Sequence, residues 1–292
     1  MLKQDQIDVY REKGYLSVEG IFSSGEVQKM QDATDEFVEK SRSVTQSDTI
    51  FDLEPDHTPE VPKIRRLLKP HTIHPVYDEV LRNSTVLDIV SELVGTEAVR
   101  FNGTKLNMKS GELGSAVEWH QDWAFYPHSN DDLLAVGVAI DEMTTQNGCL
   151  LAIAGSHKGK IYDHHQDGRF VGAVTEPDFD DSAAEPIEVA VGGISIHHVR
   201  TLHASMLNTS SKPRRLLLLM YCSGDSYSLH TGPGQIQNWE AYEATFLRGQ
   251  ASPNMRLTSC PVRLPEPGPL RPGSIFENQT VLKEKTFKAA TR

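Results

Sequence analysis

The stretch between positions 99 and 222 most constrains the fold, because it consists of short β-rich segments separated by turn residues. Turn signals such as Asn147-Gly148 and Gly192-Gly193 punctuate it. Many short strands joined by regular turns predict a closed or sandwiched β core and not a series of βαβ units. The expected architecture is therefore mainly β, a jelly roll or cupin-like double-stranded β-helix. The segments expected to be strands are 101–108, 133–140, 149–153, 187–191, 194–198 and 214–222.

Helices are expected to flank this core. Helical spacing of apolar residues and suitable caps, such as Ser23 or Ser24 with Glu26 in the following turn, predict where they begin and end. The polar, acidic stretch 43–60 is expected to be a loop, either a solvated connection or, as the alternative, a lid over a site. The expected helices are 4–13, from about 24 to 40, 85–93 and 237–247.

The whole chain, 1–292, is expected to form a single domain, since no repeat or low-complexity block divides it. Its parts are a helical N-terminal part (about 1–97), the jelly-roll core (about 98–223), and a C-terminal helix with a proline-rich tail (about 224–292). The tail is expected to run along the body of the protein or across a contact in a possible homodimer. Its prolines are Pro261, Pro265, Pro267, Pro269 and Pro272.

Charge and cysteine content narrow the partners and the compartment. The formal net charge of −11 argues against nucleic acid or an anionic membrane as the main partner, although a local basic pocket is compatible with it. The 3 cysteines form no C-x-x-C pair, which fits a reducing compartment. The N-terminus lacks the apolar core of a secretion signal, and the longest apolar run, 216–222, is too short to cross a bilayer. We expect a cytoplasmic protein with a small-molecule substrate.

His120 and Asp122 form a His-x-Asp pair in a segment that has extended character. In a strand, positions i and i+2 point to the same face, so the imidazole and the carboxylate would converge. They would supply two of the three ligands of the 2-His-1-carboxylate facial triad that holds non-haem Fe(II). A His-x-Asp pair alone is common by chance, so this interpretation requires a third ligand.

Three histidines, His197, His198 and His203, compete for the position of third ligand. His203 is followed by Ser205, a possible hydroxyl donor, and by Arg214 at the start of the next predicted strand. A dicarboxylate that chelates iron through a 2-oxo acid needs its far carboxylate fixed, and a guanidinium can bind that group bidentately. His197 and His198 should point to opposite faces of their strand, and packing there is the simpler expectation.

The chain resembles the phytanoyl-CoA dioxygenase family of Fe(II)/2-oxoglutarate oxygenases over about residues 5–223. The individual motifs are short, and their combination carries the resemblance. They are Lys105-Leu106-Asn107-Met108-Lys109, Trp119-His120-Gln121-Asp122, Tyr126-Pro127, Asn147-Gly148-Cys149-Leu150, Gly155-Ser156-His157-Lys158-Gly159, and 203–215.

The resemblance implies roles for individual residues. His120, Asp122 and His203 would bind Fe(II), and Arg214 would pair with the distal carboxylate of 2-oxoglutarate. Residues at three further positions would contact this co-substrate; for Lys105, a surface position is the alternative. Those three are Ser205, Asn107 and Lys105.

The implied reaction consumes O2 and 2-oxoglutarate, releases succinate and CO2, and hydroxylates or otherwise oxidises a C–H bond of a small organic molecule. The retained carboxylate of Asp122 favours hydroxylation over halogenation. Aromatic residues after the ligands are expected to line the substrate pocket, although core packing is the alternative. These are Trp123, Phe125 and Tyr126.

Two other functions remain open at this point. One is a jelly-roll metal-binding or regulatory protein without turnover. The other is a zinc hydrolase with the same ligands, which leaves Arg214 without a role. Among the remaining residues, Asn147-Gly148 predicts a hairpin turn, His164 and His165 are expected to be exposed, and Arg215 should point away from Arg214.

Overall fold

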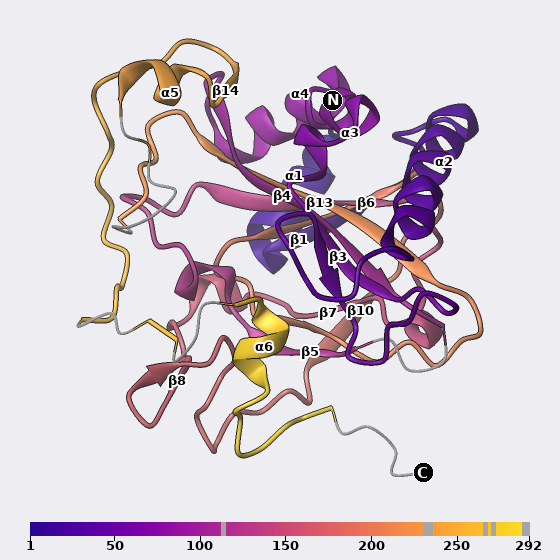
Figure 1. The fold of residues 1–292 in the computed structure, drawn as a ribbon. Coiled ribbons are helices and arrows are strands. Elements are labelled where there is room, and N and C mark those ends of the chain that lie inside the picture. Colours follow the sequence, from indigo (N-terminus) through magenta and orange to yellow (C-terminus); the bar gives the residue numbers. More distant parts are fainter. Residues whose placement is uncertain (112–114, 230–235, 237, 265–267, 270–272, 288–292) are drawn as a thin grey trace.

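The computed structural model describes residues 1–111, 115–229, 236, 238–264, 268–269 and 273–287. Its centre consists of two antiparallel sheets, and the N-terminal helices lie on one side of them (Figure 1). The large sheet has the order β1-β11-β6-β13-β4-β3-β2, with β14 also paired to β4. Its strands are β1 (Tyr15–Val18), β2 (Phe51–Leu53), β3 (Ile64–Leu68), β4 (Val99–Lys109), β6 (Leu133–Ala139), β11 (Ile194–His198), β13 (Arg214–Ser223) and β14 (Phe246–Arg248).

The small sheet has the order β10-β7-β12-β5, and a separate pair is formed by β8 and β9. From β4 onward the chain passes repeatedly from one sheet to the other, and the described strand pairs are antiparallel. This topology is a jelly roll, which confirms the predicted fold class. The strands here are β5 (Val117–His120), β7 (Leu150–Ile153), β8 (His165–Gln166), β9 (Arg169–Phe170), β10 (Ala184–Ile187) and β12 (His203–Ser205).

Helices cover the outer face of the large sheet. Val136 of β6 and Leu217 of β13 pack against Met30 and Ile89 of the helices in the largest hydrophobic core. Because side chains alternate along a strand, their neighbours in sequence face the small sheet instead. These helices are α1 (Gln4–Lys13), α2 (Ser24–Ser41), α3 (Pro75–Leu81) and α4 (Ser84–Val94). In the C-terminal part, α5 (Trp239–Glu243) precedes β14, and α6 (Ile275–Gln279) lies against β5 of the small sheet.

The caps explain where the long helices begin. The hydroxyl of Ser23 accepts a hydrogen bond from the Glu26 amide, and the Glu26 carboxylate accepts one from the Ser23 amide, as predicted for the start of α2. Asn83 caps α4 in the same way through Val86. None of the described helices combines the length and the apolar character that crossing a bilayer requires.

Several expected elements differ from the structure. The stretch 43–60 contains the strand β2 and is not only a loop. The predicted strand 187–191 is displaced, since β10 ends at Ile187. Asn147-Gly148 forms a turn between β6 and β7, which belong to different sheets, so the hairpin prediction is wrong. The C-terminal helix α5 is shorter than 237–247, and Gln237, Pro265, Pro267 and Pro272 lie outside the described residues.

Candidate active site

His120 and Asp122 converge by a route that differs from the predicted one. The strand β5 ends at His120, and Asp122 begins a 3-10 turn, Asp122–Ala124. The Phe125 amide donates to the Asp122 carbonyl and closes this turn. The two side chains therefore meet because a strand runs directly into a turn, and the expectation of a continuous strand was wrong.

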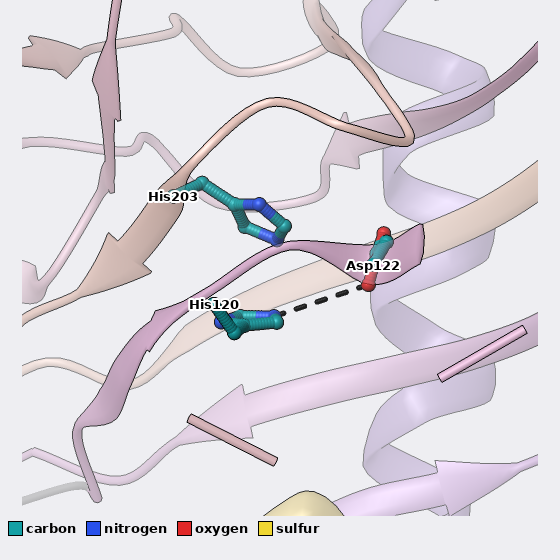
Figure 2. A group of neighbouring side chains, drawn as sticks. All are labelled: His120, Asp122 and His203. Carbon is teal, nitrogen blue, oxygen red and sulfur yellow. Dashed lines mark ion pairs between the residues drawn. The ribbon is translucent and has the colours of Figure 1, made fainter. Parts of the chain in front are cut away.

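His203 reaches the same place from the neighbouring strand. On β12 it is paired directly with His120 of β5, and the ring centroids are 4.1 Å apart. One ligand atom from each of His120, Asp122 and His203 lies within 4.8 Å of the others. Figure 2 shows the three side chains turned toward a common space. All three are buried.

Backbone carbonyls orient both imidazoles. Nδ1 of His120 lies 2.9 Å from the Glu118 carbonyl, and Nδ1 of His203 lies 2.9 Å from the Thr201 carbonyl. A carbonyl oxygen can only accept, so each Nδ1 carries the proton and each Nε2 keeps a free lone pair. This is the arrangement in which a histidine ligand is held for a metal by its other ring nitrogen.

The protonation states also suit a metal. Burial lowers the pKa of His120 to about 4 and lowers the pKa of His203 well below its ordinary value. Burial alone would raise the pKa of Asp122, but the hydrogen bond from His197 and the nearby His203 and Lys105 hold it well below its ordinary value. Metal ligands must be deprotonated, and these groups are so at neutral pH. Two imidazole nitrogens and one carboxylate are the donor set of a facial Fe(II) site.

Arg214 forms the floor of the pocket that extends inward from His120, Asp122 and His203. Its side chain is buried, and Nη2 donates to the Gly148 carbonyl at 3.0 Å. Nε and Nη1 are buried and have no hydrogen-bond partner in the described part of the chain. Burial lowers its pKa to about 10, so the guanidinium remains charged at neutral pH. Buried donors without a partner are costly, and a carboxylate would satisfy them.

A second buried basic side chain, Lys109, lies close to Arg214, and burial together with the Arg214 charge lowers the pKa of Lys109 well below the ordinary value. Lys109 donates through Nζ to the carbonyls of Ser205, at 3.3 Å, and of Met206. The described hydrogen bonds and ion pairs give neither Lys109 nor Arg214 a carboxylate partner. Asn107 and Ser205 line the same pocket, and Oδ1 of Asn107 is buried without a hydrogen-bond partner among the described residues. This floor suits the far carboxylate of 2-oxoglutarate, which is the role that the sequence predicted for Arg214.

Outside the ligands the pocket opens into a cavity of about 680 Å³. Phe125, Tyr126 and Lys105 line it beside His120 and Asp122. From the sequence, Phe125 and Tyr126 were expected in the substrate pocket, whereas Lys105 was expected at the co-substrate. Trp123 does not line the cavity: the indole is buried against Leu133 and Val199, and it donates to the Pro261 carbonyl at 2.7 Å. Trp123 is therefore a core residue, which was the alternative to lining the substrate pocket.

The C-terminal segment 273–287 closes one side of this cavity. The Gln279 side chain donates to the Gly172 carbonyl at 2.7 Å and accepts from the Glu118 amide at 3.1 Å. The Glu118 carboxylate in turn accepts from the Thr286 amide at 2.9 Å. Because Glu118 belongs to the strand that carries His120, the segment is fastened directly beside the ligands.

Two residues of this segment, Ile275 and Phe276, line the inner pocket. The Phe276 ring lies 4.7 Å from the Arg65 guanidinium. The sequence prediction missed both residues. A signal was present, since Ser274 and Glu277 form a capping box and predict a helix start there, but it does not indicate where the helix docks.

The expectation of exposed histidines in the loop after residue 160 was wrong for His164, which is buried. Its Nε2 accepts from the Gln121 amide at 2.9 Å, and its Nδ1 donates to the Tyr162 carbonyl at 2.8 Å. His164 thereby holds the backbone between His120 and Asp122. Burial lowers its pKa to about 4.

Acid should therefore destabilise the metal-free protein. Between the ordinary histidine pKa of 6.5 and the native value of about 4, the native state binds fewer protons at His164 than the unfolded state does, so the free energy of unfolding falls as pH falls. Urea unfolding at several pH values measures how steeply the free energy of unfolding falls with pH. His164→Gln should reduce that dependence by up to about 1.4 kcal/mol per pH unit. An unchanged slope would show that His164 is not held neutral.

The model of the family "Phytanoyl-CoA dioxygenase (PhyH)" matches residues 10–216. The chain belongs to this family. Over 95% of its length it is 34% identical to a "probable alpha-ketoglutarate-dependent hypophosphite dioxygenase" of Stutzerimonas stutzeri, and the match covers 97% of that protein. It is 22% identical to the ectoine dioxygenase of Bordetella bronchiseptica, over 83% of this chain and 84% of that one.

Two solved structures show the same fold. EctD from S. alaskensis in its apo form matches with a TM-score of 0.67 at 22% identity, over 88% of this chain and 87% of that one. The epimerase SnoN, in complex with Fe3+, alpha ketoglutarate and nogalamycin RO, matches with a TM-score of 0.65 at 16% identity, over 88% of this chain and 95% of that one.

Family membership and the full-length similarity confirm the predicted activity class, an iron- and 2-oxoglutarate-dependent dioxygenase, together with these cofactors. They support this function over a metal protein without turnover or a zinc hydrolase. The family match ends at residue 216, so the cavity wall formed by Ile275 and Phe276 lies outside it.

Proposed function

We propose that His120, Asp122 and His203 hold Fe(II) in this dioxygenase and that Arg214 holds the distal carboxylate of 2-oxoglutarate. The observation that carries this proposal is a continuous pocket with the three ligands at its mouth and the unsatisfied Arg214 donors at its floor. Asn107 and Ser205 add polar contacts to the co-substrate. We also propose that the whole chain is one domain, since segment 273–287 packs on the jelly roll beside the ligands.

The residues of the chain fix the geometry of the reaction. Bound Fe(II) and 2-oxoglutarate supply the O2-dependent oxidation, with release of succinate and CO2. The carbonyls of Glu118 and Thr201 hold the two imidazoles so that Nε2 of each faces the metal. Leu216, Leu218 and other apolar side chains between the ligands and Arg214 exclude water from the co-substrate. The substrate enters from the outer cavity, beside Phe125.

Lys105 lies on the substrate side of this pocket. Lys105 of β4 is paired with Leu218 of β13, whereas Arg214 of β13 is paired with Lys109 of β4. Lys105 and Lys109 are four residues apart on the strand, so Lys105 lies about 13 Å along β4 from the position of Arg214. The Lys105 ammonium has no hydrogen bond or ion pair with any described residue, and it lines both the inner pocket and the outer cavity. Burial lowers its pKa, with Asp122 opposing the shift. A bound anion would restore the charged form.

We therefore propose that the substrate is a small oxyanion and that Lys105 is its counter-ion. The full-length similarity to a protein named as a hypophosphite dioxygenase supports a phosphorus oxyanion as the first candidate. The oxidised bond is then P–H in hypophosphite or C–H in an organic phosphonate. A cavity of about 680 Å³ accommodates either. Succinate release should be screened with hypophosphite, short phosphonates, amino-acid derivatives, acyl-CoA thioesters and neutral polycyclic compounds.

Lys105→Met should raise the KM of an anionic substrate by about 10- to 100-fold, because it removes a charge-assisted hydrogen bond worth roughly 1.5–3 kcal/mol. The Kd for 2-oxoglutarate should stay within about 3-fold of wild type, a shift of less than about 1 kcal/mol. Lys105→Arg, which keeps the charge, is the matched control. Weaker 2-oxoglutarate binding with an unchanged substrate KM would instead support the co-substrate contact predicted from sequence, and turnover of neutral compounds alone would contradict the oxyanion.

A further inference from the structure

His197 is a buried histidine beside the metal ligands that the reaction as described does not use. It lies on β11, in the sheet opposite the strands that carry His120 and His203. Its ring centroid is 4.3 Å from that of His203, and the residue lines the inner pocket. Packing was the simple expectation for this position, yet the contacts of the ring are with the proposed ligands.

The contacts of the Asp122 carboxylate divide between its two oxygens. Oδ1 lies 3.9 Å from Nε2 of His120, on the side where the ligand atoms converge. Oδ2 lies 3.4 Å from Nε2 of His197. Tyr126 also hydrogen-bonds to Asp122, and its phenol pKa is raised by burial, by the charge of that carboxylate and by this hydrogen bond.

The other ring nitrogen of His197 indicates that packing does not explain this residue. Nδ1 is buried and has no hydrogen-bond partner among the described residues. A buried polar atom without a partner costs free energy, so an apolar ring would suit the fold alone better. The bond from Nε2 to Asp122 is the one hydrogen bond that the His197 side chain forms within the described part of the chain.

We propose that His197 is a positioning residue that donates its Nε2–H to Oδ2 of Asp122 and thereby leaves Oδ1 for the metal. The inference rests on the proposed function, in which Asp122 is a ligand. Each ligand then has its own orienting partner: Glu118 for His120, Thr201 for His203 and His197 for Asp122. The carboxylate is fixed to the large sheet while both imidazoles are fixed within the small one, so the site spans the two sheets.

The test is anaerobic titration of the metal-free protein with Co(II), followed by visible absorption, without co-substrate or substrate. His197→Phe removes the donor, and His197→Asn has an amide that is too short to reach Asp122. Both should weaken Co(II) binding by about 10- to 100-fold, as is typical when a partner of a ligand is lost, and should change the Co(II) spectrum. His197→Gln places an amide N–H where Nε2 lies and should restore the affinity to within a few-fold of wild type.

His198→Phe is the matched control, because His198 is the next residue on β11 and contacts Arg200 and His157 instead of the ligands. It should bind Co(II) as the wild type does. Urea unfolding of the metal-free proteins should show that His197→Phe is at least as stable as wild type, which separates metal positioning from folding.

Two results would overturn the inference: wild-type affinity and spectrum in both His197→Phe and His197→Asn, or a His197→Gln variant as weak as these two. A wild-type protein that does not bind Co(II) would contradict the metal site itself, and with it this role. If the wild type binds Co(II) and the His197 variants bind it equally well, the proposed role of His197 is contradicted while the metal site stands.

Discussion

Arg214→Met should weaken the binding of 2-oxoglutarate by at least about 30-fold, since truncating one partner of a buried, hydrogen-bonded charge pair costs roughly 2–5 kcal/mol. The physical reason is that Nε and Nη1 of Arg214 are buried at the pocket floor without a partner among the described residues, so the co-substrate carboxylate is the group that would pair with them. Calorimetric titration of 2-oxoglutarate into anaerobic, Mn(II)-loaded protein measures this loss directly.

Arg215→Met is the matched control for this experiment. Arg215 is the next residue on β13 and, as predicted, points away from Arg214: it forms ion pairs with Asp141 and Asp35, each at 2.7 Å. Its replacement should lower stability while leaving the Kd for 2-oxoglutarate unchanged. Equal losses of affinity in the two variants would show that Arg214 acts through the fold and not through the co-substrate.

Asp122→Ala should have the second large effect. It removes the only carboxylate of the His120, Asp122 and His203 group, so Fe(II) affinity and succinate formation should both fall by more than the roughly 10- to 100-fold expected when a residue merely supports a ligand. Equilibrium dialysis of Fe(II) under anaerobic conditions and a succinate assay measure the two losses.

Asp131→Ala provides the control for Asp122→Ala. Asp131 is half-buried and forms an ion pair with Arg200 at 2.8 Å, outside the site. This variant should keep both the metal and the activity. Retention of tight Fe(II) binding in Asp122→Ala would remove the carboxylate from the ligand set.

The fold was predictable because its strands are short, apolar and separated by turn residues. β11 has exactly the predicted bounds, 194–198, and β6 and β13 differ by single residues. Strands such as β6, which is buried on both faces, give a continuous apolar signal. The short strands β2 and β14 were missed: β2 lies in the expected loop 43–60, and β14 begins inside the expected helix 237–247. Three residues carry too little periodicity to identify a strand.

The grouping of His120, Asp122 and His203 was predictable from motif and resemblance, but the route by which they meet was not. Asp122 joins His120 through a turn because the chain leaves β5 at His120, and residue spacing alone does not reveal where a strand ends. Trp123 illustrates the same limit: the turn sends its ring into the core beside Pro261, while Phe125 faces the cavity.

The long-range parts of the site could not be predicted at all. Ile275 and Phe276 reach the pocket because Gln279 and Glu118 fasten the C-terminal segment beside β5, a contact between residues 161 positions apart in the sequence. His197 meets Asp122 only because the two sheets face each other. Such contacts follow from the packing of the sheets, which local patterns do not encode.

The most direct test of the central claim is the anaerobic addition of Fe(II) and 2-oxoglutarate to the wild-type protein and to Asp122→Ala, with the visible spectrum as the readout. If His120, Asp122 and His203 hold iron above the Arg214 floor, the wild type shows the weak charge-transfer band of the iron–2-oxoglutarate chelate and Asp122→Ala shows none. Absence of the band in the wild type would contradict the proposed site.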